Sequence, residues 1–207
     1  MHIGTITSSG AMFLPELIME YRRRYPNVTF QVWEAEGGRV LELLDNRVIE
    51  VAITRTQVDA SLYDSIVLPN EPLVMIMNRE LECGAEPDEV ELRDLAGRPI
   101  IVPLRWQSMF IANCNKLGFD PDIVCVSDSI VQDLLLAKMG VGIAMLPISS
   151  RTLLTDGDLS CKRLVQPEMV THTVVAWRKN RTMSTGCRQL IQLFREMYQP
   201  GPGSAAV

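Results

Sequence analysis

Apolar residues in the first third of the chain follow two alternating spacings. Residues 2–7 have the composition of a short strand, and over residues 12–21 apolar side chains recur every three or four positions, which is typical of a helix. This helix is expected to end near Tyr25, because Pro26 disfavours helical backbone in the residue before it. Residues 28–36 then alternate apolar and polar positions and predict a second strand.

The alternation of strand and helix continues up to residue 54. Gly37 and Gly38 form a predicted loop, and residues 40–45 have the spacing of an amphipathic helix that ends near Asn46. Residues 48–54 read as a short buried strand. Strands that alternate with helices in this way predict parallel α/β units.

A second series of elements follows a loop that contains Asp59, Ser61 and Asp64. Residues 80–94 are acidic and are expected to be irregular. The remaining pattern predicts strands at 73–77, 98–104, 122–128, 141–147 and 171–179, and helices at 108–119, 129–140 and 184–198. In the helix over 129–140, the residues expected to face the core are Ile130, Val131, Leu134, Leu135 and Met139. The tail over 200–207 has a disordered composition.

The two series predict two Rossmann-like lobes joined by two crossover segments. The first lobe is expected to combine residues 1–72 with 173–207, and the second to comprise residues 73–172. The predicted fold class is therefore α/β. A cleft between two such lobes is a common place for a small ligand.

Charge and composition narrow the range of functions. The chain has 207 residues, of which 47% are hydrophobic, and this is enough for a substantial core. A net charge of −5 argues against nucleic-acid binding by this polypeptide. No apolar run approaches the ~18 residues of a membrane span, and no signal peptide is visible.

The cysteines and histidines indicate neither a disulfide framework nor a metal site. His2 and His172 are far apart in the sequence, whereas a zinc site needs closer clusters. The five cysteines are widely spread and include no C-x-x-C pair: Cys83, Cys114, Cys125, Cys161 and Cys187. This usage is typical of a reducing, cytoplasmic setting, and no metal or cofactor is expected.

The first candidate binding residues are Ser8, Ser9 and Gly10, where the first strand gives way to the first helix. A helix N-terminus offers unpaired N–H groups and a partial positive charge, which favour a carboxylate or phosphate. One serine is expected to cap the helix, and the other is available to contact an anion. The sequence leaves open which serine does which.

Gly37 and Arg55 follow the next two predicted strands, and the carboxyl ends of parallel strands commonly border a ligand. Gly37 either offers its backbone N–H or simply forms a flexible turn. Arg55 suits bidentate binding of a carboxylate, and the alternative is a surface ion pair with Glu34 or Glu36.

Two similar junctions lie in the second predicted lobe. Pro103 ends a strand, and Arg105 and Trp106 then offer a cation and an apolar ring. The alternative for Trp106 is simple packing between the lobes. Asp128 and Ser129 form another such junction, for which a plain N-cap is the alternative.

Several segments together resemble the effector-binding domain of LysR-type transcriptional regulators over nearly all of residues 2–198. They are "IGTITSSGAMFLPELIMEYRRRYPNVTFQVWEAE", "LELLDNRVIEVAIT", "EPLVMIM", "ELRDLAGRPIIV" and "LAKMGVGIAMLP". The chain departs from the family pattern at Arg47, where glycine is usual, and at Glu50, where aspartate is usual. Asn46 is expected to take the left-handed conformation in place of that glycine.

The resemblance implies a type-2 periplasmic-binding-protein fold and a small-molecule effector in the cleft between the lobes, and an organic anion is the expected effector. It implies that the Ser8 position and the loop over 102–108 contact this effector, and that the protein forms a homodimer or homotetramer. The family's N-terminal winged helix-turn-helix is absent from this chain, so DNA would be contacted only through that missing domain.

Three other functions are alternatives to effector sensing. "AITRT" faintly resembles the Thr-Arg-Phe motif of prephenate dehydratase, but Thr56 replaces the phenylalanine. A transporter solute-binding protein of the same fold would need a signal peptide or a lipidated cysteine. Peroxide sensing would need reactive thiols, whereas Cys114 and Cys125 fall on a predicted helix and strand as buried residues. The sequence therefore favours a sensor domain that is not an enzyme.

Overall fold

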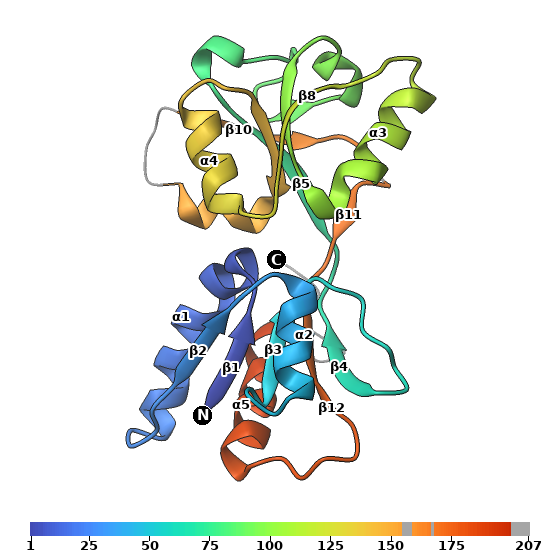
Figure 1. Ribbon diagram of the computed structural model, residues 1–207. Coiled ribbons are helices and arrows are strands. Elements are labelled where there is room, and N and C mark those ends of the chain that lie inside the picture. Colours follow the sequence, from blue (N-terminus) through green and yellow to red (C-terminus); the bar gives the residue numbers. More distant parts are fainter. Residues whose placement is uncertain (155–158, 167, 200–207) are drawn as a thin grey trace. The chain divides into compact units, whose positions relative to one another are not determined.

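The computed structural model describes residues 1–154, 159–166 and 168–199, which form two compact units (Figure 1). Unit 1 combines Met1–Pro69 with the chain from His172 onward, and unit 2 is Asn70–Thr171. The sequence places the boundaries slightly later, after residues 72 and 172. The difference arises because a strand of unit 2 already begins at Glu71 and pairs there with residues 170–171.

Unit 1 is built on a sheet with the strand order β2-β1-β3-β12-β4. β1 pairs in parallel with β2 and β3, so Thr5 aligns with Glu34 on one side and with Ile53 on the other. β12 runs antiparallel to both β3 and β4. The strands are β1 His2–Thr5, β2 Gln31–Glu34, β3 Val51–Thr54, β4 Tyr63–Val67 and β12 Val174–Arg178.

Helices cover both faces of the unit 1 sheet (Figure 1). α1 (Thr7–Arg24) and α5 (Thr185–Tyr198) pack on one face, where the apolar side chains of both helices meet Ile3, Val51 and Ile53. α2 (Gly37–Asp45) packs on the other face. Each strand alternates its side chains between these two cores, as the period of two in a strand requires.

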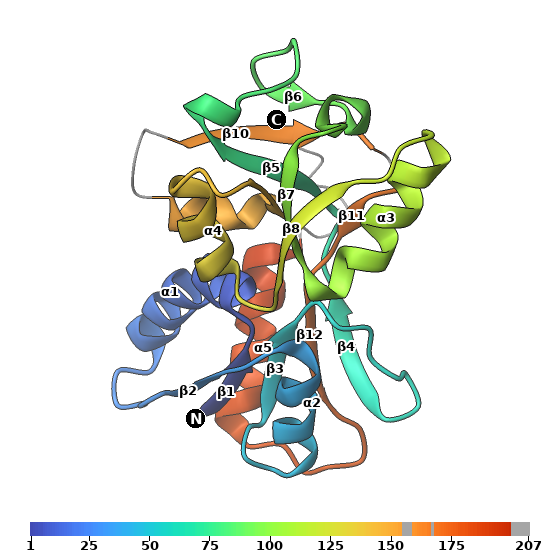
Figure 2. The same ribbon diagram turned by 45° about the horizontal axis from the view of Figure 1, so that its top comes forward.

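Unit 2 has the strand order β6-β10-β5-β9-β7-β8, with β11 paired to β5 (Figure 2). β7 pairs in parallel with β8 and β9, and β5 pairs antiparallel with β9 and β10. The strands are β5 Glu71–Asn78, β6 Glu89–Val90, β7 Pro99–Pro103, β8 Asp122–Ser127, β9 Ile143–Pro147, β10 Leu159–Leu164 and β11 Val170–Thr171.

Two α-helices cover the two faces of the unit 2 sheet. α3 (Gln107–Lys116) contributes Phe110 and Cys114 to one core, and α4 (Ile130–Lys138) contributes Leu134 and Ala137 to the other. Short 3₁₀ helices complete the described part: η1 Arg79–Leu81, η2 Leu92–Leu95, η3 Leu104–Trp106 and η4 Ile148–Leu153.

The predicted inner face of α4 is wrong in part. Val131, Leu135 and Met139 are 45%, 57% and 79% exposed, whereas the helix buries Asp133, Leu134 and Ala137. The reason is that this helix is apolar on most of its circumference, so that hydrophobic spacing alone does not identify the buried face.

The backbone after α2 also corrects an expectation. Asn46 has an ordinary φ of −80°, and it is Arg47 that takes the left-handed conformation, with φ 62°. Arg47 stands one position after the helix C-cap, where the chain reverses and a left-handed residue is commonly required. The arginine therefore occupies a backbone conformation that favours glycine.

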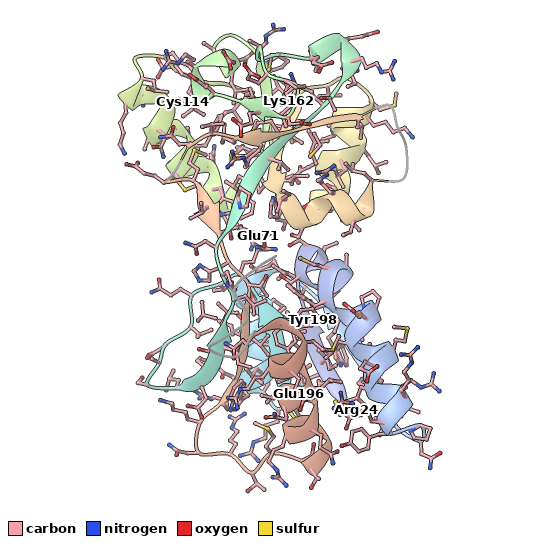
Figure 3. The ribbon with its side chains drawn as sticks, turned by 180° about the vertical axis from the view of Figure 1, so that it is seen from behind. Arg24, Glu71, Cys114, Lys162, Glu196 and Tyr198 are labelled. Atoms are coloured by element: carbon pink, nitrogen blue, oxygen red, sulfur yellow. The ribbon has the colours of Figure 1, made fainter. Side chains whose placement is uncertain are left out.

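The acidic segment over residues 80–94 is held in place by one buried lysine. Lys162 lies on β10 (Figure 3). Its Nζ donates hydrogen bonds to the carbonyls of Cys83, Gly84 and Glu86 at 2.9, 3.2 and 2.9 Å. Its Nζ also lies 3.4 Å from Oε1 of Glu82. The segment is thus anchored by a cation from a strand distant in the sequence.

Two remaining predictions concern the tail and membrane spans. The predicted disordered tail over 200–207 lies outside the described residues. Across the helices that the structure does describe, none combines the length and the apolar character needed to cross a membrane.

Candidate functional site

The carboxyl ends of the parallel strands in unit 1 bring several candidate residues to one edge of the sheet. β1, β2 and β3 end next to one another, and α1, α2 and Arg55 follow them directly. β12 runs in the opposite direction, so its first residue, Val174, aligns with Thr54 at the same edge. Ligands of α/β proteins commonly bind outside the carboxyl ends of parallel strands.

Ser8 and Arg55 contact each other at this edge. Arg55 donates a hydrogen bond from Nε to Oγ of Ser8 at 3.1 Å. Ser8 lies in the first turn of α1, ahead of Gly10, whose N–H donates to the carbonyl of Ile6. A guanidinium therefore lies beside the helix end where backbone N–H groups precede the first intrahelical bond.

The prediction that a serine caps α1 is wrong. The helix begins at Thr7, and the N-cap is Ile6, which makes no side-chain capping bond. The N–H of Ile6 donates to the carbonyl of Ile53, and its side chain packs in the core beneath α2, so an apolar residue occupies the capping position. Ser9 is fully buried, with its Oγ 3.2 Å from Oγ1 of Thr173, and it joins α1 to the residue before β12.

The two candidate glycines permit close approach of backbone to threonine side chains. A Cβ on Gly10 would lie 2.8 Å from Cγ2 of Thr5, and one on Gly37 would lie 1.9 Å from Oγ1 of Thr56. At Gly37 the carboxylate of Glu36 already accepts hydrogen bonds from the N–H groups of Gly38 and Arg39. The start of α2 thus has its own anionic cap.

Glu34 and Glu36 were the alternative partners for Arg55, and the structure shows other contacts for both. Glu34 accepts a hydrogen bond from Oγ1 of Thr7 at 2.8 Å. Glu36 is the N-cap residue of α2. These two carboxylates therefore support the starts of the two helices at this edge.

Unit 2 places its own candidates at the carboxyl edge of β7 and β8. These parallel strands align Pro103 with Ser127, so the segments that follow them are neighbours. Pro103 is buried, and the exposed Arg105 has its Cζ 5.7 Å from the ring centroid of Trp106. Trp106 is partly buried against the apolar core of unit 2. The pair presents a cation over an aromatic face.

The junction before α4 has the geometry of a helix cap. Ser129 is the N-cap and accepts a hydrogen bond from the N–H of Gln132 at 3.4 Å. Its own N–H donates to Oγ of Ser127 at 3.0 Å. Asp128 is exposed. Capping therefore accounts for Ser129.

Sequence reasoning missed several polar groups at these two edges. Asp133 is fully buried in the first turn of α4; burial raises the pKa of its carboxyl, the nearby Ser127 hydroxyl lowers it, and Asp128 raises it. Ser150 follows β9, is fully buried, and its hydroxyl has no hydrogen-bond partner in the described part of the chain. Thr56 and Ser150 could have been found from the sequence, because each is a hydroxyl residue shortly after a buried strand. Thr173 had no such local signal.

The described residues contain no group of three or more histidine, cysteine or acidic side chains placed to hold a metal ion. The five cysteines are free thiols. Burial raises the pKa of Cys114 to about 11 and that of Cys187 to about 12, far above the range of a reactive thiolate.

Comparisons with known proteins point to one family. Residues 1–199 match the family model described as the LysR substrate binding domain. The HTH-type transcriptional regulator BsdA of Bacillus subtilis is 25% identical over 199 residues, which are 93% of this chain and 67% of that protein. The chain spans about two thirds of the length of the curated relatives it matches.

Solved structures show the same fold. The effector-binding domain of a BenM variant superposes with a TM-score of 0.81 at 24% identity, covering 96% of this chain and 94% of that one. The BenM effector-binding domain with its effector benzoate gives a TM-score of 0.78 at 22% identity, covering 100% and 97%. These neighbours have the type-2 periplasmic-binding-protein-like fold.

Proposed function

Because this chain belongs to the LysR substrate binding domain family, we propose that it senses a small organic anion as the regulatory part of a longer DNA-binding transcription factor. Its relatives are transcriptional regulators of which it spans about two thirds. DNA contact falls to a winged helix-turn-helix outside this chain. The regulator acts in the cytoplasm, and ligand binding rather than catalysis is the role of the domain.

The observation that carries the anion proposal is the hydrogen bond between Arg55 Nε and Ser8 Oγ. It holds a permanently charged guanidinium beside the positive end of α1, at the carboxyl edge of the sheet. A carboxylate at this place gains charge-assisted hydrogen bonds from both the guanidinium and the helix end. The BenM neighbour has benzoate, an aromatic carboxylate, as its effector.

Within this edge the residues have different proposed roles. Ser8 and Arg55 contact the anion directly. Ser9, Gly10 and Gly37 shape the edge, since Ser9 is fully buried and the two glycines lie against threonine side chains.

Unit 2 carries candidate residues of its own for contact with the apolar part of a ligand. The ring of Trp106 and the guanidinium of Arg105 follow the end of β7, where Pro103 closes the strand. An aromatic or branched body on the ligand would gain from such a ring. Asp128 and Ser129 follow the end of β8, which lies next to the end of β7 because the register aligns Pro103 with Ser127. A ligand that contacts both units stays a prediction.

Two exposed apolar faces support self-association. β2 and β8 are the edge strands of their sheets. Beside β2, unit 1 exposes Met12, Met19 and Val32; beside β8, unit 2 exposes Val124, Val126, Val131, Leu135 and Met139. Exposed apolar edge strands are seldom left uncovered. We infer a homodimer, or a tetramer of such dimers, in which the face of one unit covers the face of the other unit in a second copy.

A thermal-shift screen of the purified domain tests the sensing proposal. A carboxylate present at about 100 times its dissociation constant adds about 2.7 kcal/mol to the unfolding free energy. For a domain of this size that corresponds to a rise in Tm of roughly 5–10 °C. The panel contains benzoate, other aromatic and aliphatic carboxylates, amino acids and phosphorylated metabolites.

The matched variants are Ser8→Ala, Arg55→Met and, as a control, Arg39→Ala. Arg39 has the same charge as Arg55, but it is exposed and pairs with Glu42 on the surface of α2. The first two variants are expected to lose the shift, and the control is expected to keep it. An anion that stabilises Arg55→Met as strongly as the native chain would contradict the proposed site.

A further inference from the structure

A cavity of about 400 Å³ lies within unit 1, away from the edge just described. It is formed by the end of α2, the residues before β3, and β12 with the loop that follows it. It therefore borders the amino end of β3, whereas Ser8 and Arg55 border the carboxyl end. Its volume falls in the range of small-molecule sites, which is about 300–1,000 Å³.

Three arginines line this cavity, and the structure holds two of them firmly. Arg181 donates hydrogen bonds from Nη1 and Nη2 to the carbonyls of Leu44 and Asp45, both at 2.9 Å. Arg178 places Nε 3.1 Å from Oδ1 of Asp45, with its Cζ 5.1 Å from the ring centroid of Tyr63. A guanidinium has five N–H donors, so both side chains keep donors beyond these contacts.

The third arginine, Arg47, occupies its position at a cost. Its φ of 62° is left-handed, and this conformation is strained for a residue with a side chain. Asn180, at φ 55°, also lines the cavity. Within residues 1–154, 159–166 and 168–199, these are the two residues other than glycine with positive φ. Left-handed residues other than glycine concentrate at functional sites.

The Arg47 side chain is exposed and makes no hydrogen bond or ion pair with any residue that the structure describes. The cavity's own carboxylate, Glu50, accepts a hydrogen bond from the N–H of Ser184 at 3.2 Å, next to α5. The positive charge of the cavity is thus only partly balanced. Trp177 and Met183 add apolar walls.

From these contacts we propose that the cavity binds a second small organic anion, a carboxylate or phosphate carried on an apolar body. Arg178 and Arg181 form the fixed part of the site, and Arg47 closes on the anionic group. Trp177 and Met183 contact the apolar body. This site is separate from the Ser8–Arg55 edge and does not depend on it.

NMR titration of the domain with phenyl phosphate, benzoate and inorganic phosphate tests this proposal. The readout is the indole N–H resonance of Trp177, assigned with a Trp177→Phe variant. We expect phenyl phosphate and benzoate to shift it saturably and to bind more tightly than inorganic phosphate, because only these two carry an apolar body. A Trp177 resonance that none of the three probes moves would overturn the proposal.

Arg47→Gly is the informative variant, because glycine removes the guanidinium and also relieves the left-handed strain. We expect it to weaken phenyl phosphate about tenfold, the loss of one charge-assisted contact, without lowering Tm. Arg47→Gln, which keeps the strain, should weaken binding to a similar degree. Arg23→Ala, which removes an exposed arginine on α1 that pairs with Glu20, is the charge-matched control and should bind normally.

A double variant, Ser8→Ala with Arg55→Met, separates this site from the proposed effector site. We expect it to keep the Trp177 response to phenyl phosphate whether or not the effector proposal holds. If it loses this response while Arg47→Gly keeps it, the anion binds at the Ser8–Arg55 edge and the second site is refuted.

Discussion

Hydroxyl groups hold together the carboxyl edge of unit 1. Ser8 accepts from Arg55, Ser9 lies against Thr173, and Oγ1 of Thr54 lies 3.3 Å from that of Thr56. The sequence indicated polar residues at the first helix start, since they lie between a strand and an apolar helix. It did not indicate Thr173, because this partner is 164 positions away and only the antiparallel insertion of β12 brings it to the edge.

Asp133 makes the stability of unit 2 depend on pH. Burial raises the pKa of its carboxyl above the ordinary 3.8, so the folded chain favours the protonated form. The protonated carboxyl therefore contributes its full stability to the folded chain below pH 3.8. This contribution is lost as the pH rises through the pKa of Asp133 in the folded chain. Asp133→Asn should therefore raise the unfolding free energy at pH 7 and have little effect near pH 3.5, as measured by urea unfolding. A stability difference that does not change with pH would contradict this.

The cysteines are expected to be poor peroxide sensors. Burial raises the pKa of Cys114 to about 11 and also raises that of Cys83 and Cys161, so almost no thiolate is present at neutral pH. Mass spectrometry of the native domain after mild peroxide treatment should find no disulfide. A bond between Cys114 and Cys125 would be the contrary result, and a urea-unfolded sample serves as the reactive control.

Among the helices and strands, apolar periodicity predicted the elements that bury one regular face. It failed for strands that form only because they pair with a strand distant in the sequence. α1 and β3 follow their apolar spacing closely. β4 was expected to be loop, because Asp64 and Ser65 interrupt its pattern; it becomes a strand by pairing with β12. β10 is likewise a strand because it pairs with β5. Neither pairing has a local signal.

β10 also carries the lysine that anchors the acidic segment. Lys162→Met would leave the carbonyls of Cys83, Gly84 and Glu86 without their donor. A buried acceptor left without a hydrogen bond costs about 1–3 kcal/mol, so losing the shared donor of these carbonyls should lower the unfolding free energy by at least about 2 kcal/mol.

Urea unfolding measures this loss, and hydrogen exchange should show faster exchange within residues 82–90. Lys116→Met is the control, because its ion pair with Glu168 is exposed and is worth less than about 1 kcal/mol. Equal effects of the two variants would contradict the anchoring role of Lys162.

At the scale of the whole molecule, the two α/β series in the sequence correspond to two units, each with helices on both faces of its sheet. The sequence predicted this class because alternating strands and helices leave few other arrangements. It did not predict which apolar residues stay exposed. The sequence pattern of α4 is the same whether an apolar residue is buried in the core of its own chain or covered by another chain.

Self-association is expected to depend on that exposed face. Leu135→Glu places a charge on a side chain that is 57% exposed, so the fold should be unaffected. Sedimentation velocity should show the native chain as a dimer or larger and the variant shifted toward monomer. Leu117→Glu, on a similarly exposed leucine at the C-cap of α3, is the control. A monomeric native chain would contradict the assembly proposed above.

Ser8 and Arg55 are proposed to bind one anion together. Isothermal titration of a carboxylate found in the screen, applied to Ser8→Ala, Arg55→Met and the double variant, tests this most directly. Each single change is expected to weaken binding, and the loss in the double variant is expected to be smaller than the sum of the two single losses by more than about 0.5 kcal/mol, because residues in contact are coupled. Additive losses, or full binding by Arg55→Met, would contradict it.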